Sequence, residues 1–231
     1  MSSILNSIAV NREPVLLGSI SSLADVSDRT VLVLRHSIRE SLRAGSVDPD
    51  LTPEGADMAK RCGRLLAGLG NDVSFAASPR TRTRRTAQCM MEGGGFPRHG
   101  VRDCPELGDL TIFARPVDFE AMLRDHNTEP VMREYYSTGR AEGLKDMRPF
   151  AEELLSFLTG TPFPASRTVI VSHDVLAMAI LSALGVRSFT IEDWCGYLHG
   201  VLLTRGRGDG IWTAAYAVPD YDAGKKHRLF V

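Results

Sequence analysis

Apolar and polar positions follow two patterns along this chain. Short apolar runs without a helical period predict buried strands, whereas apolar residues spaced three or four apart predict helices that cover a sheet. Five runs predict strands, the last two joined by a glycine-rich hairpin turn: residues 30–34, 73–77, 168–172, 200–204 and 211–218. Strands that alternate with helices and end in a hairpin predict an α/β fold, a three-layer α/β/α sandwich whose largely parallel sheet has an antiparallel edge.

Helices are expected in the gaps between these strands. Thr52 suits the N-cap and Pro53 the first turn of a helix that continues to Leu69. A second helix carries the basic residues that begin at Arg80, and the glycine run at 93–95 ends it. Two further helices are expected at 146–158 and 174–184, with a weaker strand around Val101.

Between residues 108 and 148 the pattern loosens into short helical pieces separated by prolines and glycines. Such a stretch predicts an insertion over the core, and insertions at the carboxyl edge of a sheet commonly shape substrate access. We therefore expect residues 1–231 to form one domain with a small cap-like insertion at about 108–148.

Composition argues against several classes of function but does not identify one. With 231 residues, 43% hydrophobic and 24% charged, the chain is long enough for one sizeable core. A formal net charge of -1 argues against nucleic acid or membrane as a partner. No secretory signal or bilayer-length apolar stretch is present, so a cytoplasmic location is expected. The four cysteines lack a CxxC pair or histidines at ligand spacing, which argues against zinc or disulfides.

Polar side chains that could carry chemistry follow three of the expected strands. Arg35-His36 ends the first, a basic cluster from Arg80 to Arg85 follows the second, and His173-Asp174 ends the third. Open α/β sheets keep their ligand sites at this carboxyl edge. Each motif alone is better explained as a polar turn, a solvated helix face or a local cap, because isolated matches arise easily by chance.

Four motifs in one order change that interpretation. They are RHxxR after the first strand, LTPEG at Leu51–Gly55, S-x-x-x-R-x-x-x-T-A at Ser78–Ala87 and SHD at Ser172–Asp174. On these motifs the chain resembles the histidine phosphatase superfamily, the phosphoglycerate-mutase-like proteins, over most of its length. The family's arginine lies four residues after the serine and four before the threonine, which selects Arg82 from the basic cluster.

The resemblance implies a role for each matched residue. His36 would be the nucleophile that becomes phosphohistidine, and it must be neutral at the attacking nitrogen. Arg35, Arg39 and Arg82 would clamp the phosphoryl oxygens, a task that suits the planar, permanently charged guanidinium. His173 would complete the pocket as a fourth donor.

Two carboxylates compete to protonate the leaving group. Asp174 follows the second histidine as in the acid-phosphatase branch, whose opening motif also carries an arginine at the position of Arg39. Glu106 lies 24 residues after Arg82, where the mutase branch keeps its glutamate. The agreement with Arg39 favours Asp174. One departure stands out: Ser37 replaces the family's usual glycine, so a hydroxyl contact to phosphate becomes possible.

The resemblance thus predicts a metal-independent phosphatase without a cofactor, which hydrolyses a phosphomonoester or a phosphoprotein through phosphohistidine on His36. A phosphoglycerate-mutase-type phosphotransferase is the first alternative. A non-catalytic phosphate-binding or protein-interaction module, which kept the basic pocket and lost turnover, is the second. The sequence does not indicate an oligomeric state.

Overall fold

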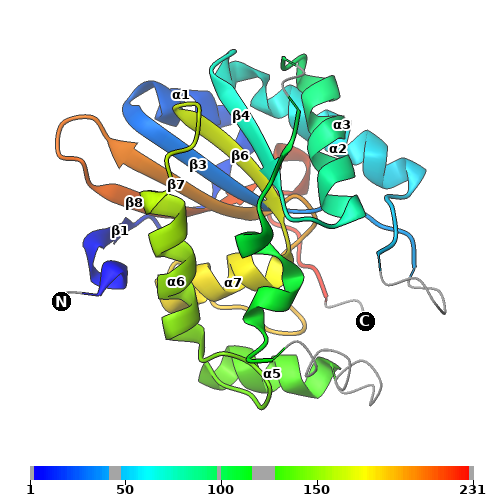
Figure 1. The fold of residues 1–231 in the computed structure, drawn as a ribbon, viewed down its shortest axis with the longest axis vertical. Helices are drawn as coiled ribbons and strands as arrows, with labels where there is room; N and C mark the ends of the chain where they lie inside the picture. Colours follow the sequence, from blue (N-terminus) through cyan, green and yellow to red (C-terminus); the bar gives the residue numbers. More distant parts are fainter. Residues whose placement is uncertain (1–2, 42–47, 98–99, 116–127, 229–231) are drawn as a thin grey trace.

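A single mixed sheet forms the centre of the computed structural model, which describes residues 3–41, 48–97, 100–115 and 128–228 (Figure 1). Within those residues the strands are β1 (Ile8–Val10), β2 (Val15–Leu16), β3 (Ser27–Arg35), β4 (Val73–Ala77), β5 (Arg102–Asp103), β6 (Arg167–Ser172), β7 (Gly200–Gly206) and β8 (Trp212–Val218). Their order is β1-β8-β7-β3-β6-β4-β5, and β2 also pairs with β8. Strand β7 runs against both of its neighbours, whereas every other pairing is parallel.

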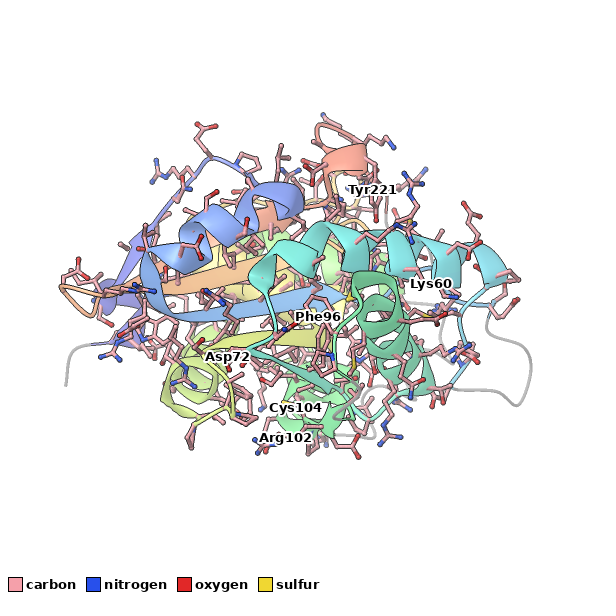
Figure 2. The ribbon with its side chains drawn as sticks, turned by 90° about the horizontal axis from the view of Figure 1, so that it is seen from above. Lys60, Asp72, Phe96, Arg102, Cys104 and Tyr221 are labelled. Atoms are coloured by element: carbon pink, nitrogen blue, oxygen red, sulfur yellow. The ribbon has the colours of Figure 1, made fainter. Side chains whose placement is uncertain are left out.

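Helices cover both faces of the sheet. They are α1 (Ile20–Asp25), α2 (Pro53–Leu66), α3 (Thr81–Gly94), α5 (Thr128–Thr138), α6 (Met147–Gly160) and α7 (Asp174–Ala183). Alternate residues of β3 enter two separate cores: Val31 and Val33 pack with α6 and α7, while Leu32 and Leu34 pack with α2 and α3. Figure 2 views these layers from above, with the blue and cyan helices α1 and α2 on one side of the strands. The three-layer sandwich is confirmed.

The expected strands and helices are present, most with longer ends. The mostly parallel sheet with an antiparallel side is also confirmed, but the β7–β8 hairpin is not outermost. Residues 8–10 and 15–16 add beyond it as β1 and β2, and α1 follows them. These elements were not expected, because two- and three-residue strands are too short to show a period.

Thr52 begins α2 as the sequence predicts. Its Oγ1 accepts a hydrogen bond from the Gly55 amide at 2.9 Å, and Pro53 occupies the first turn. Helix α3 ends at Gly95, whose φ of 68° lies in the left-handed region. These local signals place the start of α2 and the end of α3 without help from the rest of the fold.

Helices α2 and α3 pack so closely that glycine is required at their contact. A Cβ on Gly63 would lie 2.0 Å from the Met90 carbonyl oxygen, and one on Gly93 would lie 2.1 Å from that of Lys60. Real Cβ atoms do not approach carbonyl oxygens so closely. The pair of glycines therefore sets the distance between the two helices that carry the LTPEG and arginine motifs.

Part of the expected cap-like insertion lies outside the described residues, since 116–127 fall there. Of its described parts, α5 contacts the start of α7, where the Tyr136 hydroxyl donates to the Val175 carbonyl at 3.1 Å. The single domain and its cap stay predictions. No helix within the described ranges is long and apolar enough to cross a membrane. The cytoplasmic location stays a prediction too.

All four cysteines are buried free thiols. Burial raises the pKa of Cys104 to about 12 and that of Cys195 to about 12. A thiol needs its thiolate to act as a nucleophile, so these cysteines are poorly suited to catalysis.

Candidate active site

The strand order places the three sequence motifs side by side. Strand β6 lies between β3 and β4 and is parallel to both, so the carboxyl ends of all three meet at one edge. His36 follows β3, His173 follows β6, and Ser78 follows β4 just before α3. The rings of His36 and His173 lie 5.6 Å apart in an edge-on arrangement.

His36 is held as a neutral imidazole. It is 5% exposed, and its Nδ1 lies 2.7 Å from the Ser37 carbonyl oxygen. A carbonyl only accepts, so Nδ1 carries the proton and Nε2 keeps its lone pair. Burial lowers the pKa of His36 well below its usual value, and the charges of His173, Arg82 and Arg35 lower it further. Nε2 is therefore ready to act as a nucleophile at neutral pH.

Arg35 and Arg82 bring two buried guanidinium groups to the histidines. Arg35 donates from Nη1 to the Cys195 carbonyl at 2.5 Å, and its Nη2 lies 3.1 Å from Asp174. The Arg35 guanidinium also stacks on Tyr197, 4.2 Å from the ring centroid. The Nε atoms of Arg35 and Arg82 are buried and have no hydrogen-bond partner among the described residues. Each of these two guanidinium groups thus keeps one buried N–H without an acceptor, which costs free energy. A bound oxyanion would remove this cost by accepting from both groups.

Arg82 also holds His173 in place. Its Nη2 lies 3.4 Å from His173 Nδ1, while His173 Nε2 lies 2.8 Å from the Ser78 hydroxyl. Arginine can only donate, so Nδ1 accepts and the ring proton sits on Nε2. Burial is the largest effect on the pKa of His173 and lowers it to about 4. His173 is neutral near pH 7 in the unliganded pocket.

Arg39 lies at the pocket margin. It is half-buried, and its Nη1 donates to the carbonyl of Glu40 at 3.0 Å. Burial lowers its pKa, and so does the nearby positive charge of Arg82 and Arg35. The three arginines predicted to act together therefore lie close enough to repel one another, which favours an anion between them.

Three donors hold the Asp174 carboxylate, and one of them is the Val175 amide, which donates to Oδ1 at 2.9 Å. Its Oδ2 accepts from the Trp194 indole at 2.8 Å and lies 3.1 Å from Arg35 Nη2. Burial would raise the pKa of Asp174, but Arg35 and the Trp194 hydrogen bond outweigh it and hold that pKa below its usual value. The indole N–H of Trp194 therefore orients this carboxylate.

The loop that carries Glu106 contributes a different carboxylate to the pocket. Glu106 is exposed, in the 3-10 turn η4 (Pro105–Leu107). Asp109, three residues on, accepts from Arg82 Nη2 at 2.7 Å and from Arg80 Nε at 2.9 Å. Burial would raise the pKa of Asp109, but His173, Arg82 and Arg80 together lower it. Sequence reasoning missed Asp109, which begins the next 3-10 turn, η5 (Asp109–Ile112), although it stands only three residues after Glu106 in the sequence.

Ser37 is engaged within the protein. Its hydroxyl donates to the Gly55 carbonyl at 2.7 Å, and its amide donates to Thr86 Oγ1 at 3.1 Å. Thr86 Oγ1 in turn donates to the carbonyl of Arg82 at 2.7 Å. The serine that replaces the family glycine therefore ties the nucleophile loop to α2 and α3, and its hydroxyl is already committed to a protein acceptor.

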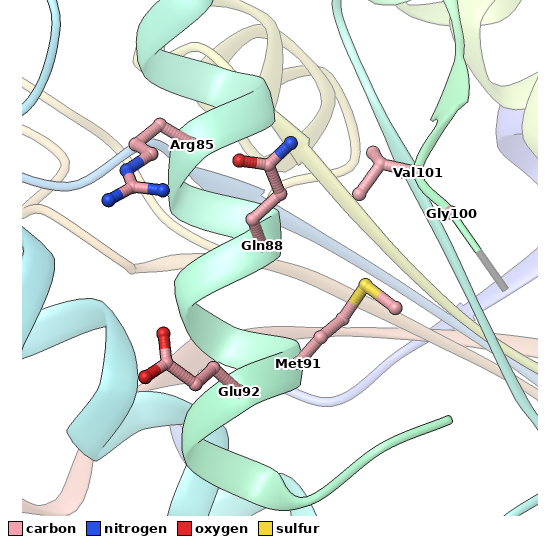
Figure 3. A pocket seen from close by; sticks show the side chains of 6 residues that line it. All are labelled: Arg85, Gln88, Met91, Glu92, Gly100 and Val101. Carbon is pink, nitrogen blue, oxygen red and sulfur yellow. The ribbon is translucent and has the colours of Figure 1, made fainter. Parts of the chain in front are cut away.

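The remaining arginines of the basic cluster lie outside the pocket or at its border. Arg84 forms an exposed ion pair with Asp103 at 2.7 Å, and Arg80 reaches Asp109. Arg85 lines a groove on the outer side of α3 together with Gln88 and Glu92 (Figure 3). Among the cluster's arginines, only Arg82 contacts His173, as the spacing predicts.

A buried neutral histidine beside two arginines whose Nε donors are unpartnered, at the carboxyl edge of a three-layer sandwich, suits phosphoryl transfer, which needs a nucleophile with fixed positive charge around it. The chain belongs to the histidine phosphatase superfamily, since the model of branch 1 of that superfamily matches residues 31–201. The family resemblance is thereby confirmed.

Curated relatives in this family are named as mutases. A 2,3-bisphosphoglycerate-dependent phosphoglycerate mutase of Afipia carboxidovorans is 38% identical over 69% of this chain and 82% of its own. The enzyme of that name from Azorhizobium caulinodans is 30% identical over 68% of this chain and 82% of its own.

Solved structures with this fold include phosphatases. A mycobacterial glucosyl-3-phosphoglycerate phosphatase matches with a TM-score of 0.51 and 17% identity, covering 83% of this chain and 99% of its own. At that identity the likeness shows the fold alone. The acid-phosphatase features suggested by Arg39 and Asp174 stay a prediction, because the matching model is that of branch 1.

Proposed function

We propose that this protein is a phosphatase that hydrolyses phosphomonoesters, on small molecules or on phosphoproteins, through a phosphohistidine at His36. The observation that carries the proposal is the pair of buried, unpartnered Nε donors of Arg35 and Arg82 beside a neutral His36. In the first step His36 Nε2 bonds to phosphorus and the ester oxygen leaves with a proton. In the second, water attacks phosphorus, the P–N bond breaks, and inorganic phosphate and neutral His36 remain.

The arginines stabilise the charge that this exchange develops. Arg35, Arg39 and Arg82 bind the three equatorial oxygens of the phosphoryl group, where negative charge is spread in the transition state. His173 joins them once the arriving dianion favours its protonated form, because a nearby anion raises the pKa of an imidazole.

Asp109 is our proposed proton donor, in place of the carboxylates that the sequence favours. It is bonded to Arg82, the residue that must bind phosphate, so an arriving phosphoryl group competes with Asp109 for the guanidinium. Loss of that partner and the nearby dianion both raise the pKa of Asp109, and the protonated carboxyl can then protonate the leaving oxygen. Asp174 would instead orient Arg35, because Trp194 and Arg35 occupy its Oδ2.

The charge balance of the pocket favours hydrolysis of a monoester over transfer from a bisphosphate. Three carboxylates pair with three of the arginines: Asp174 contacts Arg35, Asp48 contacts Arg82, and Asp109 contacts both Arg80 and Arg82. Among the described residues of the pocket, Arg39 is then the cation in excess. One phosphoryl dianion suits this balance. A bisphosphoglycerate carries two phosphates and a carboxylate and would need more positive charge. The mutase remains the second candidate because the curated relatives carry that name.

Two assays separate these activities. Release of inorganic phosphate from p-nitrophenyl phosphate and from 3-phosphoglycerate is measured alongside conversion of 3- to 2-phosphoglycerate in the presence of 2,3-bisphosphoglycerate. We expect phosphate release that persists with a chelator. Conversion without release would establish the mutase, loss of release on chelation would overturn the metal-free mechanism, and inactivity from acidic to neutral pH would favour a non-catalytic phosphate-binding module.

The proton donor is tested by comparing leaving groups in three variants. Asp109→Asn is expected to lower kcat about 100-fold or more for alkyl phosphates and far less for p-nitrophenyl phosphate, whose leaving group needs little protonation. Asp174→Asn should slow both substrates alike, and Glu106→Gln should slow neither. If the leaving-group dependence appears in Asp174→Asn or Glu106→Gln instead, Asp109 is not the donor.

A further inference from the structure

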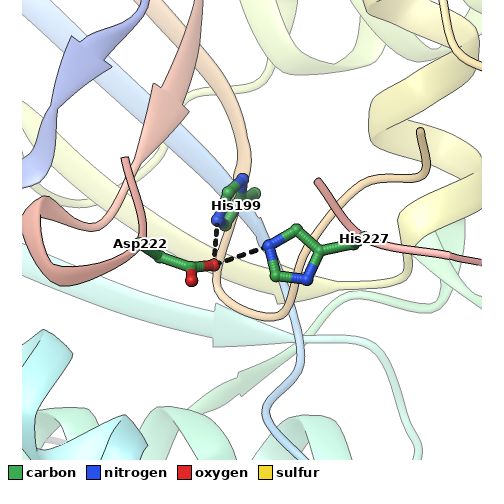
Figure 4. A group of neighbouring side chains, drawn as sticks. All are labelled: His199, Asp222 and His227. Carbon is green, nitrogen blue, oxygen red and sulfur yellow. Dashed lines mark hydrogen bonds and ion pairs between the residues drawn. The ribbon is translucent and has the colours of Figure 1, made fainter. Parts of the chain in front are cut away.

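A second cluster of histidine and carboxylate side chains lies outside the proposed phosphoryl pocket (Figure 4). His199 precedes β7, Asp222 ends the 3-10 turn η6 (Asp220–Asp222), and His227 follows in the C-terminal segment. Oδ2 of Asp222 lies 2.7 Å from Nε2 of His199 and 2.8 Å from Nε2 of His227. The three donor atoms all lie within 4.8 Å of one another. Three metal-ligating groups thus converge from distant parts of the sequence.

Hydrogen bonding satisfies His199 but leaves one nitrogen of His227 without a partner. Nε2 of His227 is buried, and although it is close to Asp222 it has no hydrogen-bond partner among the described residues. A buried ring nitrogen without a partner is costly in a folded protein. The nitrogen nevertheless lies almost as close to Oδ2 of Asp222 as His199 Nε2 does, so three potential metal ligands are gathered in a small volume.

Gly196 leaves space beside both ring nitrogens. A Cβ at this position would lie 2.7 Å from His227 Nε2 and 2.8 Å from His199 Nε2. Any side chain at residue 196 would therefore collide with the donors, whereas glycine keeps a point between them free. Glycine at residue 196 therefore leaves room for an ion beside both nitrogens.

The outer partner of His199 matches that of a metal ligand. Its Nδ1 lies 2.6 Å from the hydroxyl of Tyr216, which can donate or accept. Without an ion, Nε2 donates to the Asp222 carboxylate and Nδ1 accepts from Tyr216. An ion bound at Nε2 would displace that proton, Nδ1 would then donate to Tyr216, and ligating histidines are commonly oriented by such a second bond.

We propose that His199, Asp222 and His227 bind one divalent transition-metal ion of the zinc type. Two imidazoles and a carboxylate suit zinc and its neighbours, whereas magnesium and calcium prefer oxygen ligands throughout. Tetrahedral coordination with bonds near 2.0 Å separates its donors by about 3.3 Å, so Asp222 must withdraw by about half an ångström from its present contacts. Lys225, 3.1 Å from Oδ1 of Asp222, competes with the ion for this carboxylate.

The ion would join the C-terminal segment to the loop that holds the pocket arginine. That loop carries Trp194 and Cys195, whose contacts fix Asp174 and Arg35, and the Trp194 amide already donates to the His227 carbonyl. The loop also holds buried Leu198 at a φ of 63°, a strained conformation that persists only where its surroundings impose it. The metal role is therefore structural, and it does not depend on the proposed phosphatase activity.

The test uses the full-length protein without a histidine tag. After chelator treatment and dialysis, zinc and cobalt are titrated, with bound metal measured by elemental analysis and cobalt coordination by visible absorption. We expect about one equivalent per chain, the intense visible bands of tetrahedral cobalt, and no comparable binding of magnesium or calcium. Saturating zinc should raise the Tm by about 5 to 10 °C at a hundredfold excess over Kd.

Variants assign the binding to this cluster. His227→Ala should weaken binding at least about 100-fold and Tyr216→Phe about 10-fold, since outer partners tune affinity on that scale. Lys225→Gln, an exposed change, should tighten binding because it removes a competing cation. His36→Ala should bind as the wild type does. Absence of binding in wild type and Lys225→Gln alike, or loss of binding in His36→Ala, overturns the proposal.

Discussion

Side chains in the pocket depend on one another's charge. Arg82 contacts Asp48, Asp109 and His173 at once, so its guanidinium is shared before any substrate arrives. An oxyanion that binds Arg82 therefore changes the charge state of both neighbours, raising the pKa of Asp109 and of His173. In the proposed mechanism a bound phosphoryl group thus favours protonation of both Asp109, the proposed proton donor, and His173, because both contact Arg82.

His36→Ala should abolish turnover and leave the fold intact. The change removes the proposed nucleophile, its hydrogen bond from Nδ1 to the Ser37 carbonyl and its ring contacts with His173 and Tyr197. We expect kcat to fall at least about 1,000-fold with little change in Tm. Acid-quenched reactions with radiolabelled substrate should trap phosphoenzyme in the wild type and none in the variant. A variant that keeps near-normal turnover would remove His36 from the mechanism.

Ser37→Ala should affect stability more than turnover. The Gly55 carbonyl, which lies within α2, would lose the Ser37 donor, and a lost hydrogen bond of this kind costs about 0.5 to 1.5 kcal/mol. We expect a lower denaturant midpoint and a kcat within about threefold of wild type, because the hydroxyl is committed to Gly55. A large loss of kcat at unchanged stability would instead indicate that the hydroxyl contacts substrate.

At the scale of elements, the helix pair α2–α3 supports the nucleophile loop. Ser37 reaches both helices, through Gly55 in α2 and Thr86 in α3. The distance between the helices is set by Gly63 and Gly93, where each backbone approaches the other's carbonyl. A change in the packing of these two helices should therefore also move the loop that carries His36.

Gly63→Ala should destabilise the protein by overpacking this contact, by about 1 to 3 kcal/mol or more. Gly160→Ala at the end of α6 is the matched control, since a Cβ there meets nothing within 4 Å and the backbone needs no left-handed φ. The control should be neutral or stabilising by up to about 1 kcal/mol. Equal denaturant midpoints for the two variants would show that α2 and α3 adjust freely.

For the whole molecule, buried neutral histidines make stability depend on pH. The folded pKa values of His173 and His199 are about 4, below the ordinary value near 6.5. As pH falls from 6.5 toward 4, the unfolded chain takes up protons that the folded chain does not. The free energy of unfolding therefore decreases with acid, by about 1.4 kcal/mol per pH unit for each histidine.

Denaturant midpoints at pH 7 and pH 5, measured in chelator, check this slope. Wild type should lose stability over this range, and His173→Asn should lose about 2 kcal/mol less because one of the titrating groups is gone. The comparison of slopes separates titration from any constant damage by the substitution. Identical slopes would mean that His173 titrates alike in the folded and unfolded chains.

Local sequence was sufficient for the elements and for most of the proposed site. Strand β4 has the predicted bounds, Thr52 caps α2, and the spacing around Arg82 selected the one arginine of the cluster that contacts His173. Short-range signals succeed here because strand burial and helix caps depend on neighbouring residues. The two-residue strand β2 escaped detection, since only its pairing with β8 defines it.

The sequence by itself determined which side chains end which strands, and hence that histidines and arginines gather at one edge of the sheet. Only the tertiary structure decided which partners those side chains meet. Asp109 was distinguished from Glu106 by its contact with Arg82, and Asp222 was brought to His199 and His227. The order of strands and helices follows from local backbone preferences and burial. Which side chains contact one another depends on how distant segments pack, and the spacing of residues along the chain does not indicate it.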